Sequence, residues 1–295
     1  MRKEKGFYAA KIYQAFRRNL LRGRYLGNSS LPVKIFAEPL IKLLSWRKRM
    51  KVFPADPWGT RMRFLLGWWE PETVKVCEEI IKPGMTIVDV GAHVGYYTRI
   101  FSELVGKKGK VLAFEPHPAT FNFLSFNIPP FSYPNVKLFP LALSDRKETL
   151  ALFEVKGSGK HSFYDVSSLA ERDPQAYEFK KKWKVKAEIL DEILDEHEIQ
   201  NVDFMKVDVE GAELRVLKGA EKTIRQSANI QLIVEFNIGT LSLAGVLPEE
   251  FIKQLKNLGF RKILGVDDVE RKLRPVKELW ERAQAGYIDL LCSKS

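Results

Sequence analysis

Residues 86–98 read TIVDVGAHVGYYT, an apolar run that stops at Asp89 and continues into a segment containing Gly91 and Gly95. The run has the length and composition of a strand that is buried on both faces of a sheet. A helical pattern follows over residues 96–105. A chain that turns sharply from a strand into a helix needs positive φ angles or a close backbone approach, and glycine permits both. The segment therefore predicts a strand, a tight turn and a helix.

Apolar strands and amphipathic helices alternate along most of the chain. Further strands are expected over residues 111–115, 136–143, 149–155, 202–208, 231–236, 261–266 and 286–292, and helices over 73–82, 118–128, 212–224 and 248–258. This alternation predicts an α/β fold with a mostly parallel, seven-stranded sheet and helices on both faces. Ligands of such sheets bind beyond the carboxyl ends of the strands, so the residues that end each strand are candidates for a site.

The composition indicates a folded domain without a membrane span. The chain has 295 residues, of which 45% are hydrophobic and 29% charged, as in ordinary globular domains. Its apolar stretches are far shorter than the roughly 20 residues of a membrane-spanning helix. Charges interrupt every apolar run near the amino terminus, which predicts no secretory signal. Cys77 and Cys292 are too few for a disulfide framework, so a reducing, cytoplasmic location is expected.

The net charge of +11 is concentrated in the amino-terminal part. Residues 1–63 carry 16 lysines and arginines against three acidic residues, a net charge of +13, whereas the rest of the chain has a net charge of −2. Residues 7–22 have the pattern of a basic amphipathic helix. We therefore expect a basic helical extension, residues 1–63, before a main domain, residues 64–295. Peripheral contact of residues 1–51 with a membrane surface is expected, with packing of these helices on the domain as the alternative.

Five predicted strands have an acid at or near their carboxyl end: Asp89, Glu115, Asp145, Asp208 and Glu235. Glu115 follows Asp89 by 26 residues, at the end of the next strand, where an acid can accept both hydroxyl groups of a ribose. The loop after Asp89 lacks the G-x-G-x-x-G pattern of dinucleotide sites, and the chain lacks a phosphate-binding G-x-x-x-x-G-K-[ST] loop. An acid at this place repels a pyrophosphate but suits an ammonium group, which favours S-adenosylmethionine as the ligand.

These residues and several further motifs resemble the FkbM-type methyltransferases that use S-adenosylmethionine. The resemblance covers roughly residues 68–237, from WWEPET through KPGMTIVDVGAHVGYYT, GKVLAFEPHPATFNFLSFNI and LALSD to VDFMKVDVEGAELRVLKGA and LIVEFN. It implies a Rossmann-like class I methyltransferase fold. The cofactor-binding residues that it implies are Asp89, Gly91, His93, Gly95, Glu115, Ser144 and Asp145. The family usually has Asn at the position of His93, a departure that leaves the predicted loop intact.

The resemblance places Asp208 and Glu210 where the fourth parallel strand reaches the methyl group. Transfer to a hydroxyl group requires alignment of the acceptor and removal of its proton, and we expect these two carboxylates to do this. With Glu235 they could instead hold a divalent cation, but no metal site is predicted. Glu213 is expected on the surface of the following helix, and His117 is expected in solvent.

The predicted reaction is O-methylation of a hydroxyl or carboxyl group of a sugar, glycan or other small molecule. One alternative is an RNA methyltransferase whose basic extension binds phosphates, although the main domain is slightly acidic. Another is a non-catalytic scaffold that retains the fold, which the intact cofactor loop disfavours. The sequence leaves the acceptor and the oligomeric state open.

Overall fold

The structure is a computed structural model that describes residues 31–165, 178–267, 272–279 and 287–295. The helix expected over residues 7–22 lies outside these ranges. Among the helices in the described ranges, none has both the length and the apolar character needed to cross a membrane.

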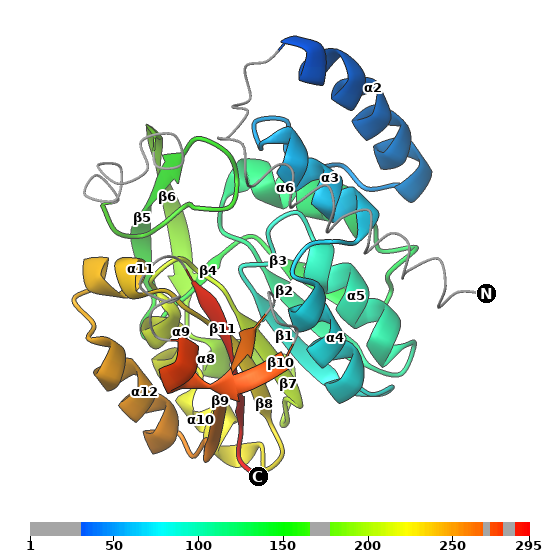
Figure 1. The fold of residues 1–295 in the computed structure, drawn as a ribbon. Helices are drawn as coiled ribbons and strands as arrows, with labels where there is room; N and C mark the ends of the chain where they lie inside the picture. The colour runs from blue at the N-terminus through cyan, green and yellow to red at the C-terminus, as the bar shows by residue number, and fades with distance from the viewer. Residues whose placement is uncertain (1–30, 166–177, 268–271, 280–286) are drawn as a thin grey trace.

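The main sheet has eight strands in the order β10-β9-β11-β8-β7-β1-β2-β3 (Figure 1). Five are parallel to one another: β1 Thr86–Val90, β2 Lys110–Phe114, β3 Val136–Phe139, β7 Phe204–Val207 and β8 Gln231–Phe236. Three are antiparallel to their neighbours: β11 Ile288–Ser293, β9 Lys262–Asp267 and β10 Lys272–Pro275. The predicted α/β class is confirmed, and β10 adds an eighth strand to the seven expected.

Helices cover both faces of this sheet. On one face, α4 (Pro71–Ile80) and α5 (Tyr96–Val105) pack on apolar side chains of β1, β2 and β7. The opposite face carries α8 Leu190–Glu196, α9 Glu213–Gly219, α10 Glu221–Gln226, α11 Ile238–Leu243 and α12 Pro248–Asn257. Helix α6 (Pro118–Asn127) follows β2 and buries Leu124 against Ala92 and Ala113. Two apolar layers therefore hold the sheet between them, as parallel strands require.

A second sheet stands beside the first and has the order β4-β6-β5. It consists of β4 (Ala142–Leu143), β5 (Glu148–Val155) and β6 (Phe179–Glu188). The single strand expected over residues 136–143 is wrong, because β3 ends before Pro140 and β4 joins the second sheet. Proline cannot donate a ladder hydrogen bond, so it breaks the strand there.

Two helices precede the main domain in the described chain, α2 (Leu31–Lys48) and α3 (Trp58–Leu66). Figure 1 shows α2 at one end of the molecule, beside α3. Arg61 on α3 donates to Glu38 on α2, with 3.1 Å between Nη1 and Oε2. Ile41, Phe64 and Leu65 join the apolar cluster under α4 and α5. The domain boundary at residue 63 stays a prediction, and α3 continues across it.

Helix α9 approaches the second sheet so closely that a side chain at Gly219 has no room. A Cβ atom there would lie 2.0 Å from the carbonyl oxygen of Ser144. We expect Gly219→Ala to lower the free energy of unfolding by about 1–3 kcal/mol, the usual cost of overpacking. Gly59→Ala is the control, because a Cβ atom at this position of α3 meets nothing within 4 Å and alanine favours a helix by roughly 0.5–1 kcal/mol. Urea unfolding measures both, and equal stability of the two variants would contradict the packing argument.

Candidate functional site

The strand register gathers four ionisable side chains on one face of the main sheet, near the carboxyl ends of the parallel strands. Asp89 on β1 pairs in register with Lys206 on β7, and Asp289 on β11 pairs with Glu235 on β8. Each of the four is at least 95% buried. Alternate residues of a strand point to the same face, and Ile87, Phe204, Ile233 and Leu291 place these side chains under α4 and α5.

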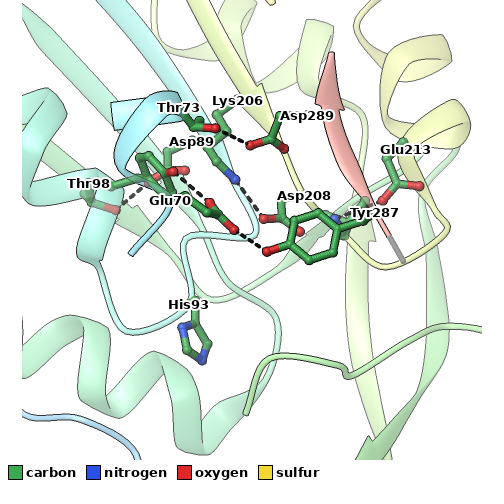
Figure 2. Close-up of polar contacts among 12 residues, drawn as sticks. Glu70, Thr73, Asp89, His93, Thr98, Lys206, Asp208, Glu213, Tyr287 and Asp289 are labelled. Atoms are coloured by element: carbon green, nitrogen blue, oxygen red, sulfur yellow. Dashed lines mark hydrogen bonds and ion pairs between the residues drawn. The ribbon is translucent and has the colours of Figure 1, made fainter. Parts of the chain in front are cut away.

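Lys206 is the buried cation of this cluster (Figure 2). Its Nζ atom lies 2.7 Å from Oδ2 of Asp208 and 4.6 Å from the ring centre of Tyr97. Burial alone lowers the pKa of Lys206, but the carboxylates of Asp208, Asp289 and Glu70 outweigh it and hold the pKa above its ordinary value. The lysine therefore stays charged at neutral pH and balances part of the surrounding negative charge.

The hydroxyl groups of two threonines hold two of the surrounding acids. Thr98 on α5 donates to Oδ2 of Asp89 at 2.6 Å, and Thr73 on α4 donates to Oδ2 of Asp289 at 2.8 Å. Burial raises the pKa of Asp89 to about 6, despite the hydrogen bond from Thr98 and the charge of Lys206. Both acids thus connect the sheet to the helices that cover it.

Glu70 enters the cluster from the residue before α4, with a left-handed backbone at φ 41°. Two phenol groups donate to its carboxylate, Tyr97 at 2.7 Å and Tyr287 at 2.8 Å. Burial and the nearby Asp289 raise the pKa of Glu70 to about 8. About half of the Glu70 carboxyl groups are therefore protonated at a pH near 8.

The loop after β1 is held by close backbone contacts. A Cβ atom on Gly91, at φ 82°, would lie 1.9 Å from the carbonyl oxygen of Asp208. One on Gly95, at φ 89°, would lie 2.9 Å from Leu124 on α6. Both glycines are required by positive φ and by space, which confirms the conformational reason for expecting them in the turn. Their contact with a cofactor stays a prediction.

Glu115, directly after β2, accepts hydrogen bonds from backbone amides of two neighbouring segments. The amide of His93 donates to Oε2 at 3.0 Å, and the amide of His117 donates to Oε1 at 2.9 Å. Burial raises the pKa of Glu115 to about 7. The expectation that His117 lies in solvent is wrong: its side chain is 1% exposed and its Nδ1 accepts from the amide of Thr120 at the start of α6.

His93 lies in the loop at φ 54°. Its Nε2 is 2.5 Å from Oγ of Ser158, which in turn donates to Oδ2 of Asp56 at 2.7 Å. Burial lowers the pKa of His93, so the ring is neutral at physiological pH. The histidine thereby ties the loop after β1 to the segment that follows β5.

The loop after β7 folds around a buried carboxylate. Glu213 is 1% exposed and accepts from the amides of Val209 and Gly211, each at 3.1 Å. The expectation that Glu213 lies on the helix surface is therefore wrong. The Glu213 carboxylate accepts hydrogen bonds from backbone amides in the turn between β7 and α9, where neither the sheet nor the helix provides an acceptor for them. Glu213 is a positioning residue for Asp208 and Glu210.

Glu210 and Glu235 are acids of the site whose pKa values are raised, and at Glu210 the charge of Lys160 offsets part of the rise. Glu210 is half-buried at φ 52°, and burial and Asp208 raise its pKa to about 8. Burial and Glu210 also hold the pKa of Glu235 well above its usual range. Within the described residues, Oε2 of Glu235 has no hydrogen-bond partner.

Ser144 and Asp145 lie apart from the lysine-centred cluster, after β4 of the second sheet. Ser144 donates to Oδ1 of Asp145 at 3.1 Å, and Asp145 forms an ion pair with Arg215 at 3.0 Å. Burial raises the pKa of Asp145, but Arg215 outweighs this and holds it below the ordinary value. A narrow cavity of about 10 Å³ adjoins them, lined by Val90, Gly91, Phe114, Pro116, Leu141, Ala142, Leu143, Phe163 and Val209.

The structure thus brings Asp89, Gly91, Glu115 and Asp208 together at one edge, with Glu210 beside Asp208. The described residues include no group of three or more His, Cys, Asp or Glu side chains arranged to hold a metal ion. The sequence prediction missed Lys206, Tyr97 and Asp289. Lys206 left a signal, because it is the one charged residue inside the apolar run FMKV of β7.

Removal of the buried cation should destabilise the fold. Lys206→Met leaves Asp208 and Asp289 without their ammonium partner, and we expect a loss of about 3–5 kcal/mol in the free energy of unfolding. Adding Asp208→Asn should recover part of this loss, because the two residues are coupled. Lys218→Met, at an exposed position of α9, is the control and should change stability by less than about 0.5 kcal/mol. Urea unfolding at pH 7 measures the cycle, and an additive double variant would disprove the coupling.

Comparison with known proteins identifies the family. The model of the methyltransferase FkbM domain matches residues 89–262, more than half of the chain. The 2-O-methyltransferase NoeI of Sinorhizobium fredii is 27% identical over 166 residues, which cover 52% of this chain and 67% of that protein. The hexuronic acid methyltransferase AglP of Haloferax volcanii is 29% identical over 198 residues, 66% of this chain and 70% of that protein.

Among solved structures, a methyltransferase FkbM from Methylobacillus flagellatus aligns with 88% of this chain and 59% of its own, at 13% identity and a TM-score of 0.44. The family assignment rests on the sequence matches, which agree with the strand-end acids and the glycine loop after β1. The chain belongs to the FkbM family of methyltransferases and is an enzyme that transfers a methyl group from S-adenosylmethionine.

Proposed function

We propose that the enzyme methylates an oxygen atom of a sugar or glycan. One relative is named a 2-O-methyltransferase, which supports transfer to oxygen, and another is named a hexuronic acid methyltransferase, which supports a sugar acceptor. The observation that carries the proposal is the carboxyl group of Glu210 beside Asp208, whose pKa is raised to about 8, because a hydroxyl acceptor needs a base to remove its proton. The proposal also includes hydroxyl or carboxyl groups of other small molecules as acceptors.

The residues at the sheet edge fit S-adenosylmethionine. When bound, this cofactor supplies an electrophilic methyl group on a positively charged sulfur. We assign the ribose hydroxyls of the cofactor to Glu115. Its ammonium group is assigned to the sheet edge at Asp89. Gly91, His93 and Gly95 form the cofactor loop in this proposal. A side chain at Gly91 would collide with the carbonyl group of Asp208, so this loop can approach the loop after β7 only with glycine here.

The adenine ring is assigned to the cavity beside Ser144 and Asp145. Its walls are apolar, as a purine face requires, and include Pro116, Leu143 and Phe163. A cavity of about 10 Å³ holds roughly one water molecule, so the lining must open when a purine binds. Phe163 is one of the lining residues outside both sheets and lies in the segment after β5, and we expect it to move.

The electrostatics distinguish the roles of the two proposed catalytic acids. Asp208 is held by the ammonium group of Lys206 at 2.7 Å, which fixes the position of its carboxylate. Burial and Asp208 raise the pKa of Glu210 to about 8 despite the charge of Lys160, which suits a general base near neutral pH. We therefore assign the base to Glu210 and alignment of the acceptor to Asp208.

Glu235 is a poor candidate for the base. Its pKa is well above the usual range because burial and Glu210 disfavour its charged form. A protonated carboxyl group can donate a hydrogen bond but cannot accept the proton of an acceptor hydroxyl. Its unpartnered oxygen suits contact with a sugar hydroxyl.

Loss of the ribose anchor should weaken cofactor binding. We expect Glu115→Ala to lower the affinity for S-adenosylmethionine by about 10–100-fold, since hydrogen bonds to a charged group contribute about 1.5–3 kcal/mol. Calorimetric titration measures this, with Glu103→Ala, an exposed acid on α5, as the control for lost charge. Thermal unfolding of each variant verifies the fold. Unchanged affinity in folded Glu115→Ala would refute the ribose assignment.

Loss of the base should affect turnover and leave cofactor binding intact. Glu210→Gln should lower kcat by about 10²–10⁴-fold at an unchanged Kd for S-adenosylmethionine. A base acts only when it is deprotonated. Wild-type kcat/KM should therefore rise with pH and level off above a midpoint at the pKa of Glu210, about 8. This limb should vanish in Glu210→Gln. A screen of hexuronic acids and neutral sugars supplies the acceptor for these assays. If kcat/KM of Glu210→Gln still rose with pH about the same midpoint, the base would be another residue.

A further inference from the structure

Large apolar side chains are exposed on the face of the molecule that carries α2 and the end of α6. Leu40, Leu43 and Trp46 are 44%, 56% and 78% exposed and follow one another at helical spacing along α2. Phe126 near the end of α6 and Phe131 in the following loop are 50% and 84% exposed. Single exposed apolar residues are common, but five on adjoining elements mark an interaction surface.

Cations surround these side chains. One groove is lined by Trp46, Phe126 and Phe131 together with Lys42, Arg47, Lys48, Arg49, Lys51 and Arg99. Its one acidic lining residue is Glu38, which is paired with Arg61. The groove measures about 1590 Å³, above the roughly 300–1,000 Å³ of small-molecule pockets. We call these residues, with Leu40 and Leu43, the basic aromatic face.

The main domain holds this face in a defined shape. The side chain of Asn127 on α6 bonds both backbone groups of Lys51, accepting from its amide at 2.7 Å and donating to its carbonyl at 2.8 Å. Arg99 on α5 donates to the carbonyl of Lys48 at 3.1 Å. Nζ of Lys51 lies 3.5 Å from the ring centre of Phe126. The cations after α2 therefore have fixed positions beside the aromatic rings.

We propose that the basic aromatic face docks the enzyme on the surface of an anionic lipid membrane. Tryptophan and phenylalanine insert at the level of the lipid headgroups, and each nearby Lys or Arg gains about 1 kcal/mol from anionic lipid. This proposal goes beyond methyl transfer and extends the contact expected for residues 1–51 to α6 and its loop. It is independent of the acceptor.

The composition of the face favours lipid over single-stranded nucleic acid. A nucleic-acid groove needs cations and aromatic rings on which bases stack, and the groove offers both. Leu40 and Leu43 contribute exposed aliphatic surface that base stacking does not use, and Phe131 is almost fully exposed on its loop. Insertion into the headgroup region buries such side chains. The net charge of −2 outside residues 1–63 also disfavours a long polyanion along the rest of the molecule.

Co-sedimentation of the full chain with vesicles tests the proposal. Vesicles of phosphatidylcholine alone are compared with vesicles that also contain phosphatidylserine, at two salt concentrations. The apolar variant is Trp46→Ala with Phe131→Ala, and its control is Phe179→Ala with Leu247→Ala, two exposed apolar residues elsewhere. The charge variant is Arg47→Glu with Arg49→Glu, and its control is Lys184→Glu with Lys186→Glu on β6, which changes the net charge equally.

Wild type and both controls should bind the anionic vesicles at least tenfold more tightly than either face variant, and high salt should weaken their binding. All five proteins should bind S-adenosylmethionine alike, which verifies their folds. The proposal would be overturned if the face variants bound anionic vesicles as tightly as their controls do. It would also be overturned if wild type bound phosphatidylcholine vesicles as tightly as anionic vesicles. Loss of binding to a single-stranded RNA probe in the face variants, without any vesicle binding by wild type, would assign the face to nucleic acid instead.

Discussion

The ion pair between Lys206 and Asp208 determines how the rest of the site can be built. Parallel strands bring their carboxyl ends to one edge, and this chain places an acid at nearly every one of them. Buried carboxylates without a cation lose their hydration and repel one another. Lys206, 2.7 Å from Asp208 and near Asp289 and Glu70, offsets part of this cost while leaving the edge with excess negative charge. An excess of that sign is what a cationic ligand requires.

The cluster also joins parts of the chain that lie far apart in the sequence. Glu70 precedes α4, Asp89 ends β1, Lys206 lies in β7 and Asp289 lies in the antiparallel strand β11 (Figure 2). The hydroxyl groups of Thr73 and Thr98 connect these acids to α4 and α5. The site is complete only when β11 has inserted next to β8, so assembly of the site depends on the last strand of the sheet.

A second set of contacts connects the segment after β5 to the edge. Ser158 and Ser162 lie after β5 and bond His93 and the carbonyl of Glu210, respectively. Phe163 of the same segment lines the narrow cavity beside Leu143. The segment therefore contacts both the loop after β1 and the loop after β7.

The sequence by itself determined the fold class, the turn glycines and most strand ends, because strand and helix periodicity and φ > 0 are local properties. It failed for β6, whose run FKKKWKVKAE has too many lysines to be recognised as a strand without its partners β4 and β5. It also failed for Glu213, because only the folded loop shows that amide groups surround this carboxylate. The burial of Lys206 and its proximity to Asp289 and Glu70 were decided by tertiary structure alone. Register across a sheet and burial under helices join residues that no local pattern connects, and they set the charges and pKa values on which the chemistry depends.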